Sequence, residues 1–562
     1  MPVKEHMKIW LYKKIKQFQR YLTDATYRKK MHDLELDYQE LSNDNSSWAS
    51  EMISGKTKGY YAVISFSNLP FFVKFHAITT KAMELRGYQS MAITASGNHY
   101  ARKVFELFRV DTIILWDEYC KKHIALRDKI KGIVQTILPS ELTIEAAIEM
   151  KYKGVDVGKH ALSMTCRKRI EGRLILTDLV TREMFFHFLE ESIFSVLVSE
   201  KLFEEFPIKK QLIRDSGYVP NGGIFEVGLE MGVDSVVVEF GQKKSSWIFK
   251  RHTKETKSRH YFSLSDSTWD EFKQKPLTDA MKKAVDNEVS GRYNPVSDED
   301  TRRLQSGKVI KSKEEVQKQL GLDPNKKTAV IFSHVAWDAT FFYGKCLFTD
   351  YEDWLFQTVD FVNKNCPNIN WIVKVHPYNA FKLQRETIKT TSEERLLAEL
   401  MPFQKHVVMM MPDTDINSQS LFNVIDFALT VNGSVGFEYP IFGINAVLAG
   451  TGRYEGFGFT VEPQTREEYF EQLKNIQLIP ALSESQRELA LKHYYYAIVG
   501  KQVMFDDVAP MSLLKLHEAD SSVHNNIKII AKNLQDFEAK KSVQLWSAWM
   551  CDLKTPDLLN TI

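Results

Sequence analysis

Short apolar runs alternate with segments of helical periodicity along the chain, and this alternation limits the possible folds more than any other feature. The first such series predicts strands and helices in turn at residues 60–67, 71–86, 90–94, 99–108 and 112–115. Alternation at this spacing is typical of a parallel, doubly wound sheet. Ligands bind just outside the carboxyl ends of such strands, so functional residues are expected directly after them.

The scheme continues further along the chain. A helix is predicted over 182–202, followed by a glycine-rich loop that opens a helix ending at Gly232 and by a strand over 235–240, whereas 251–325 is polar and lysine-rich and contains a domain boundary. Beyond it we expect a helix at 351–363 and strands at 328–332, 371–375, 406–410, 424–429 and 446–449. The predicted fold class is α/β, with two Rossmann-like domains facing a central cleft and additional N-terminal and C-terminal helices.

Composition excludes several classes of protein. Lys and Arg (74) nearly balance Asp and Glu (72), so the overall charge gives no reason to expect a nucleic-acid partner. The five cysteines lie far apart without a CxxC spacing, which favours a reducing, cytoplasmic setting. No uninterrupted apolar run reaches about 18 residues, so neither a membrane span nor secretion is expected.

The first thirty residues differ from the rest, with nine Lys or Arg against Glu5 and Asp24. Apolar residues recur at helical spacing among them, as in a helix that lies on an anionic membrane surface. The alternative is a basic surface helix packed on the domain behind it. The first interpretation predicts peripheral association with the inner face of the cytoplasmic membrane through residues 1–30.

In WIVKVHPYN (371–379), an apolar strand that carries Lys374 ends on His376 and Pro377. Because proline disfavours helical geometry in the residue before it, His376 should stay extended and project from the edge of the sheet. Its imidazole can donate a hydrogen bond to a phosphate oxygen in either protonation state. The alternative is a buried histidine that is satisfied by the backbone.

In VNGSVGFEYP (431–440), a tight turn at Asn432 and Gly433 follows a strand, and a helix is expected from Ser434 onward. The free amides of Gly433 to Val435, the Ser434 hydroxyl and the positive helix end would form an anion site. Glu438 lies one turn further on the same face and could accept hydrogen bonds from ribose or sugar hydroxyls. Alternatively, Ser434 is only a helix cap and Glu438 a solvated residue.

The loop SHVAWDATFFYG (333–344) follows the strand at 328–332, so His334 and Asp338 should lie at the same sheet edge as His376. Its aromatic residues either wall a base or sugar or pack between the domains. As catalytic bases we consider Asp338, Glu226 and, less favoured, His76 in the first helix. Asp413-Thr414-Asp415 has the letters of a metal-binding DxD triplet but reads as a loop, so a metal-independent reaction is expected.

KVHPYN, TVNGSVGFEYPIFG and GTGRYEGFGFTVEP (450–463) resemble the carboxyl-terminal domain of GT-B capsule and surface-polysaccharide glycosyltransferases. The His-Pro pair and the serine motif also resemble the two signatures of GT-B sialyltransferases, polysialyltransferases and capsular Kdo transferases, which use CMP-activated acidic sugars. The resemblance implies that His376 and Ser434 hold the donor phosphate. That family also has an acidic pair before a glycine, and no such triplet occurs in 60–240.

The resemblance implies a glycosyltransferase that moves a sugar from a nucleotide-sugar to a polysaccharide or glycolipid acceptor, with no cofactor and no metal. The expected donor-binding residues are His334, Lys374, His376, Pro377, Asn432, Gly433, Ser434, Val435 and Glu438, and the expected catalytic residues are Asp338, Glu226 and His376. A UDP- or GDP-sugar-dependent transferase, a nucleotide-sugar epimerase or hydrolase, and a non-catalytic assembly scaffold are the alternatives.

A chain of 562 residues should contain more than one domain. We expect a basic helical segment at 1–55, an acceptor domain with a helical insertion at 56–320 and a donor domain at 321–505. Helices at 506–562 are expected to pack back on the acceptor domain.

Overall fold

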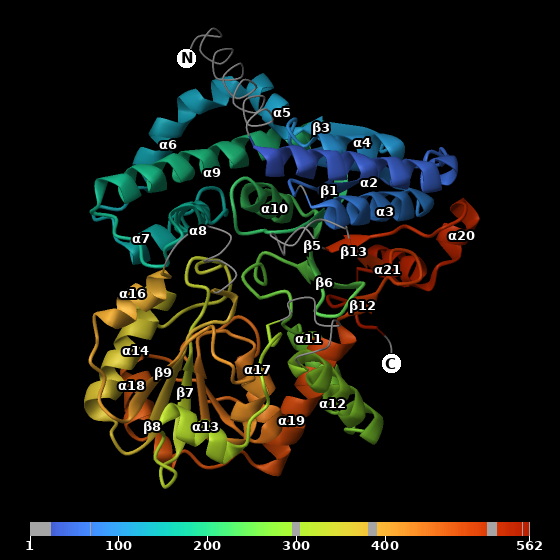
Figure 1. Cartoon of the computed structure of the whole chain (residues 1–562). Helices are drawn as coiled ribbons and strands as arrows, with labels where there is room; N and C mark the ends of the chain where they lie inside the picture. The colour runs from blue at the N-terminus through green and yellow to red at the C-terminus, as the bar shows by residue number, and fades with distance from the viewer. Residues whose placement is uncertain are drawn as a thin grey trace. The chain divides into compact units, whose positions relative to one another are not determined.

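The computed structural model of the chain describes residues 24–67, 69–294, 304–379, 390–513, 525–553 and 555–560. It contains two compact units (Figure 1): one comprises residues up to Lys121 with Phe505–Cys551, and the other Lys122–Met504 with Asp552–Ile562. The predicted membrane-surface helix at 1–30 lies almost entirely outside the described residues. None of the described helices is long and apolar enough to span a membrane. The predicted domain boundaries stay predictions.

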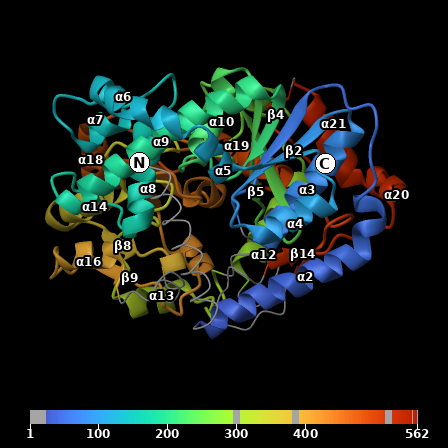
Figure 2. The same cartoon turned by 90° about the horizontal axis from the view of Figure 1, so that it is seen from above.

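The first unit contains three parallel strands in the order β1 (Tyr60–Ile64), β2 (Gln89–Thr94) and β3 (Thr112–Leu115). Helices α3 (Pro70–Leu85) and α4 (His99–Leu107) connect them, and α4 also contacts α2 (Ala25–Ala49), as Figure 2 shows. The alternation predicted for residues 60–115 is confirmed. Pro70 begins α3 and costs the helix no hydrogen bond, because the first N–H groups of a helix have no partner within it.

Carboxyl-terminal elements complete this unit: β13 (Met511–Leu513), β14 (Asn525–Ile527), α20 (Leu534–Ala539) and α21 (Lys541–Cys551). Arg86 at the end of α3 donates hydrogen bonds to Ser547 and Gln544 of α21, at 3.1 and 2.8 Å. The buried Lys74 of α3 donates to Asp37 of α2 at 2.7 Å. Polar bonds therefore join α2, α3 and α21 around the apolar core.

The second unit has one sheet that contains β4 (Ile208–Ile213), β5 (Asp234–Phe240), β6 (Ser246–His252) and β12 (Val503–Met504). Strands β4 and β5 are parallel and joined by α10 (Asn221–Glu230), whereas β6 is antiparallel to both β5 and β12. Helices α8 (Val157–Arg169) and α9 (Leu179–Glu205) contact each other, and α9 contacts α10. Strand β5 was predicted from the sequence, whereas β4 and β6 were not.

The other sheet of this unit has five parallel strands in the order β11-β10-β7-β8-β9. Their bounds are β7 (Thr328–Phe332), β8 (Asn370–Lys374), β9 (Val407–Met410), β10 (Phe427–Thr430) and β11 (Asn445–Leu448). All five were predicted, with shifts of up to three residues at their ends, and the predicted α/β fold class is confirmed.

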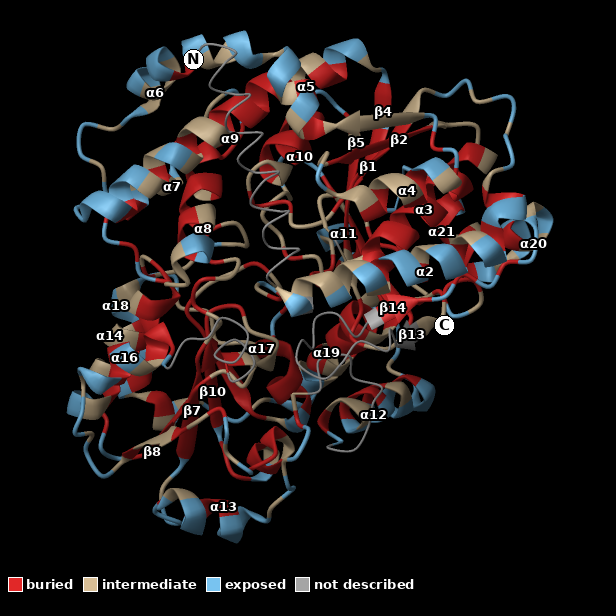
Figure 3. Ribbon diagram, turned by 45° about the horizontal axis from the view of Figure 1, so that its top comes forward, coloured by how far each residue is buried: buried red, intermediate tan, exposed pale blue. Residues whose placement is uncertain are grey.

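Helices cover both faces of this sheet, which explains why its strands read as continuous apolar runs. Tyr351 and Trp354 of α14 (Tyr351–Asn365) and Tyr469 of α18 (Arg466–Lys474) pack on one face. Val316 of α13 (Lys313–Leu320) and Tyr439 pack on the other. Figure 3 shows β7 and β10 as buried.

The register of the parallel strands aligns the residues that follow them. Phe332 of β7 pairs with Lys374 of β8, and Ile331 pairs with Leu429 of β10. Two residues beyond the first pair, His334 and His376 take equivalent places on neighbouring strands, and Asn432, three residues beyond the second pair, takes the equivalent place on β10. Adjacent strands are about 4.8 Å apart, so these residues form a row along the carboxyl edge of the sheet.

Candidate active site

A cavity of about 260 Å³ lies within the second unit, where the carboxyl ends of strands from its two sheets meet. Arg214 and Asp215 after β4 and Glu239 in β5 line it from one sheet, and His334 after β7 and Asn432 after β10 line it from the other. The lining therefore combines cations, carboxylates and neutral donors, as expected for a site at strand ends.

Arg453 enters the cavity lining from the glycine-rich segment after β11. One terminal nitrogen of its guanidinium lies 2.7 Å from Nε2 of His260, and its Nε is buried and has no hydrogen-bond partner among the residues that the structure describes. No carboxylate of the described residues lies within 4.0 Å of it. Burial lowers the pKa of Arg453, because removal from water disfavours the charged form. A cation in this state is a natural partner for an anionic ligand.

His334 supplies a neutral donor beside Arg453. The backbone N–H of Val431 donates to its Nε2 at 3.1 Å. An amide N–H can only donate, so the neutral ring must carry its proton on Nδ1. Burial lowers the pKa of His334 to about 3, with further contributions from His376 and Arg453. The ring also stacks on Tyr351, with centroids 4.5 Å apart.

Carboxylates reach the cavity from the other sheet. Nε of Arg214 lies 3.0 Å from Glu239, and another of its nitrogens lies 3.5 Å from Asp215. Burial raises the pKa of Glu239 to about 7 although Arg214 opposes the shift. Asp215 has a φ of 57°, a left-handed conformation that is strained for this residue and is often found at functional sites.

Asp338 also lines the cavity, in the loop after β7. The hydroxyl of Tyr218 donates to its Oδ1 at 2.7 Å, and the backbone N–H of Ala339 donates to the same hydroxyl at 3.0 Å. A Cβ on Gly217 would lie 2.0 Å from the ring of Phe342, so the close approach of these two loops needs a glycine. Asp338 is thereby held between the edges of the two sheets.

The His-Pro histidine lies at the same sheet edge but is not part of the cavity lining. The backbone N–H of His376 donates to the Ser333 hydroxyl at 2.9 Å. The backbone N–H of Tyr378 donates to Nδ1 of the His376 ring at 3.2 Å. Pro377 separates these two residues and prevents the strand from continuing into a helix at once. The structure thus places His376 beside His334, which reaches the cavity.

The serine motif is arranged differently from the prediction. Helix α17 (Val435–Glu438) is a single turn, because Pro440 follows, so it has little macrodipole for an anion site. The Gly433 amide donates to Thr430 at 2.9 Å. Arg292 donates to the Ser434 hydroxyl at 3.0 Å and forms an ion pair with Glu438. Glu438 is a buried partner of Arg292, so the alternative of a solvated residue is wrong, and a contact of Glu438 with sugar hydroxyls stays a prediction.

Two other candidate bases lie away from the strand ends where they were predicted. Glu226 is in the middle of α10, where its carboxylate accepts from His160 and from the backbone of Asp156, both at 3.0 Å, and contacts Lys257. His76 is buried in α3 of the first unit. Neither side chain belongs to the cavity lining.

Lys374 is buried at the end of β8 and has no carboxylate within 4.0 Å among the described residues. Burial lowers its pKa to about 7, and Lys308 adds to the shift. Replacing Lys374 with methionine should stabilise the fold by about 1–3 kcal/mol, because the stem is kept and the uncompensated amine is removed. Urea unfolding measures this change, and a less stable variant would show that the amine has a favourable partner.

Enclosed histidines should make the fold sensitive to acid. Burial lowers the pKa of His252, His334 and His493 to about 3, and that of His260 well below its usual value. The unfolded chain takes up these protons near pH 6.5 and the folded chain does not, so stability falls as the pH drops below about 6.5. Each histidine should contribute about 1.4 kcal/mol per pH unit.

The melting temperature between pH 7.5 and 5 measures this dependence. Neither ring nitrogen of His493 has a hydrogen-bond partner within the described part of the chain, and the ring packs against Phe457 and Phe459. In His493→Phe, the loss of unfolding free energy per pH unit should therefore be smaller by about 1.4 kcal/mol, the contribution of one histidine. Stability that does not change over this range would contradict the buried, neutral state of these rings.

Within the described residues, no group of three or more His, Cys, Asp or Glu side chains could hold a metal ion. Asp415 of the DxD-like triplet lies in a loop, and its carboxylate accepts from Lys311 and Gln319. A reaction without metal stays a prediction.

No family model matches the sequence, and no curated protein matches it. Solved structures similar to the chain include a KpsC β-Kdo 2,4-transferase of Thermosulfurimonas dismutans, with 15% identity, 50% of this chain and 79% of that chain covered and a TM-score of 0.31. A glycosyltransferase of Rickettsia africae has 9% identity, 79% and 94% coverage and a TM-score of 0.26. A UDP-GlcNAc 2-epimerase of Neisseria meningitidis has 11% identity, 78% and 97% coverage and a TM-score of 0.23.

Proposed function

We propose that the chain is a glycosyltransferase that moves a sugar from a nucleotide-sugar to an acceptor hydroxyl. The observation that carries this proposal is Arg453, a cation with no carboxylate partner among the described residues, in a cavity whose lining also holds Asp215, Glu239 and Asp338. Sugar transfer needs a cation for the leaving phosphate and a carboxylate for the acceptor proton. The cavity supplies both kinds of group.

The proposed step forms a bond between the acceptor oxygen and the anomeric carbon. The bond from that carbon to the phosphate oxygen breaks, and its electron pair leaves on the phosphate. Arg453 and the Nδ1–H of His334 stabilise the growing negative charge. His376 lies beside His334 at the end of the neighbouring strand and assists it, and Asn432 adds a side-chain amide at the cavity wall.

The acceptor proton goes to a carboxylate, and we assign this role to Asp215. Asp215 is the second residue after β4, and its side chain is 32% exposed, so an acceptor can reach it. Asp338 already accepts the Tyr218 hydroxyl. Glu239 lies closer to Arg214 than Asp215 does and is less exposed, at 12%.

The donor we propose is a CMP-activated acidic sugar, and the acceptor a surface or capsular polysaccharide or a glycolipid. This choice is supported by the resemblance of the His-Pro and serine motifs to transferases of such sugars. The buried Lys374 at the end of β8 and the row of His334 and His376 give the sheet edge further donors. A site at the inner face of the cytoplasmic membrane, reached through residues 1–30, belongs to the same proposal.

Incubation with CMP-, UDP- and GDP-sugars, with and without a capsular polysaccharide acceptor, tests the proposal. A transferase releases nucleotide only when the acceptor is present and extends the acceptor. Acceptor-independent release indicates a hydrolase, and an isomerised sugar on an intact nucleotide indicates an epimerase. A scaffold gives no turnover, and no nucleotide raises its melting temperature.

A further inference from the structure

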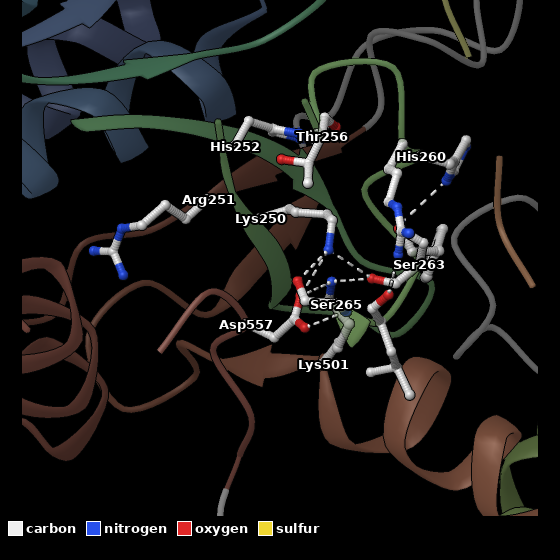
Figure 4. A network of polar contacts seen from close by, with 12 residues as sticks. Lys250, Arg251, His252, Thr256, His260, Ser263, Ser265, Lys501 and Asp557 are labelled. Atoms are coloured by element: carbon white, nitrogen blue, oxygen red, sulfur yellow. Dashed lines mark hydrogen bonds and ion pairs between the residues drawn. The ribbon is translucent and has the colours of Figure 1, made fainter. Parts of the chain in front are cut away.

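The carboxyl-terminal residues of the second unit bring an aspartate between two lysines (Figure 4). Oδ1 of Asp557 accepts from Lys250 at 3.0 Å and from Lys501 at 2.9 Å, and all three side chains are fully buried. Lys250 belongs to β6, and Lys501 follows the π-helical turn Tyr495–Gly500. One carboxylate thus compensates two buried ammonium groups, which makes its removal costly.

The same three side chains fix the position of residues 263–265, which belong to the loop that follows β6. Both lysines donate to the carbonyl oxygen of Ser263, at 3.1 and 2.9 Å. Lys250 also donates to the hydroxyl of Ser265 at 3.0 Å, and the backbone N–H of Ser265 donates to Oδ2 of Asp557 at 2.7 Å. The position of residues 263–265 is therefore set by Asp557 and its lysines.

This loop leads directly to the cavity. The N–H of Ser263 donates to the carbonyl of His260 at 2.8 Å, and the N–H of His260 donates to the carbonyl of Gly452 at 2.8 Å. Nε2 of the His260 ring lies 2.7 Å from a guanidinium nitrogen of Arg453. Polar contacts thus run without a break from Asp557 through Ser263 and His260 to Arg453.

We propose that residues 555–560 form a clasp that positions Arg453 for its anionic ligand, with Asp557 as the positioning residue. The proposal rests on the proposed function only in that Arg453 binds a phosphate. Nε2 of His260 lies 2.7 Å from a guanidinium nitrogen of Arg453, so the ring fixes the place of the guanidinium without adding a negative charge. Release of the clasp frees this loop, so the guanidinium loses its orientation and the cavity loses affinity for phosphate.

The test uses Asp557→Asn in the full chain and measures the affinity for CMP, UDP and pyrophosphate by calorimetry, well below the melting temperature. We expect binding about tenfold weaker than in the wild type, because misorientation by a fraction of an ångström weakens a charged contact. Lys501→Met leaves a balanced Lys250–Asp557 pair and should fold even if Asp557→Asn does not. It should also weaken binding, since the Ser263 carbonyl loses one donor.

Asp37→Asn is the matched control, because it breaks a buried Lys–Asp pair of 2.7 Å in the first unit. It should lower the melting temperature and leave the affinity for pyrophosphate unchanged. Wild-type affinity in both Asp557→Asn and Lys501→Met, or an equal loss in Asp37→Asn, would overturn the clasp. Binding of pyrophosphate without sugar transfer would overturn the proposed function and leave the clasp intact. A wild type that binds neither nucleotides nor pyrophosphate would overturn both.

Discussion

Replacing Arg453 with methionine should lower kcat/KM for the nucleotide-sugar by about 10²–10³ while the protein stays at least as stable as the wild type. Activity falls because the leaving phosphate loses its cation. Stability is kept because the guanidinium that is removed has no carboxylate partner in the described part of the chain, and a side chain of similar length fills its place. Steady-state kinetics and thermal unfolding of the same preparation measure the two effects.

Arg292→Met provides the contrast in stability. The Arg292 side chain is 8% exposed and is paired with Glu438, so its loss leaves a buried carboxylate alone and should cost about 3–5 kcal/mol. Opposite changes in melting temperature for the two arginines would support the different roles assigned to them. Wild-type kcat/KM in Arg453→Met would show that the phosphate binds elsewhere.

Asp215→Asn should lower kcat by about 10²–10⁴ with little change in the affinity for the nucleotide, since the amide cannot take the acceptor proton. The size of the side chain is unchanged, so the strained turn after β4 should persist. Rapid-quench measurement of a single turnover separates this chemical step from donor binding.

Asp338→Asn is the matched control for this prediction. It should have a smaller effect, because Asp338 already accepts the Tyr218 hydroxyl. If Asp338→Asn abolishes turnover and Asp215→Asn does not, then Asp338 is the base, as the sequence alone had suggested. Equal rates in both variants and the wild type would exclude either carboxylate from proton transfer.

Strands made mostly of apolar residues, and the functional residues that follow them, could be predicted from the sequence. Residues 328–332 form β7 at the predicted bounds, and His334, Asp338 and Asn432 lie in the cavity lining. Strands β4 and β6 were missed because polar residues follow one another in each, Lys209-Lys210-Gln211 in β4 and Lys250-Arg251-His252 in β6, whereas β8 with its single Lys374 was predicted. Lys210 forms an ion pair with Asp234 at 2.7 Å, and Lys250 forms one with Asp557. Both partners lie far along the chain, so the sequence around each strand does not reveal them.

Missing these two strands had direct consequences for the site. Arg214 and Asp215 follow β4, and His260 belongs to the loop after β6, so none was considered. The apolar residues of the run at 208–213, followed by Arg-Asp-Ser-Gly, were the signal for a strand end. Arg453 lies in the segment 450–463, which the sequence had already pointed to. That it has no acidic partner among the described residues depends on how the chain folds, so the sequence could not show it.

Long-range contacts also changed the roles of predicted residues. Arg292 lies 142 positions from Ser434, and Glu226 meets Lys257 across 31 positions. No local pattern reveals such partners, because burial of a charge next to its counter-ion depends on how distant helices and strands pack.

The most direct test of the phosphate site compares nucleotides with their nucleosides by calorimetric titration of the wild type and of Arg453→Met. Our account predicts that CMP or UDP binds the wild type far more tightly than cytidine or uridine, and that Arg453→Met abolishes this difference. Nucleosides that bind as tightly as nucleotides, or a phosphate preference that survives in Arg453→Met, would contradict it.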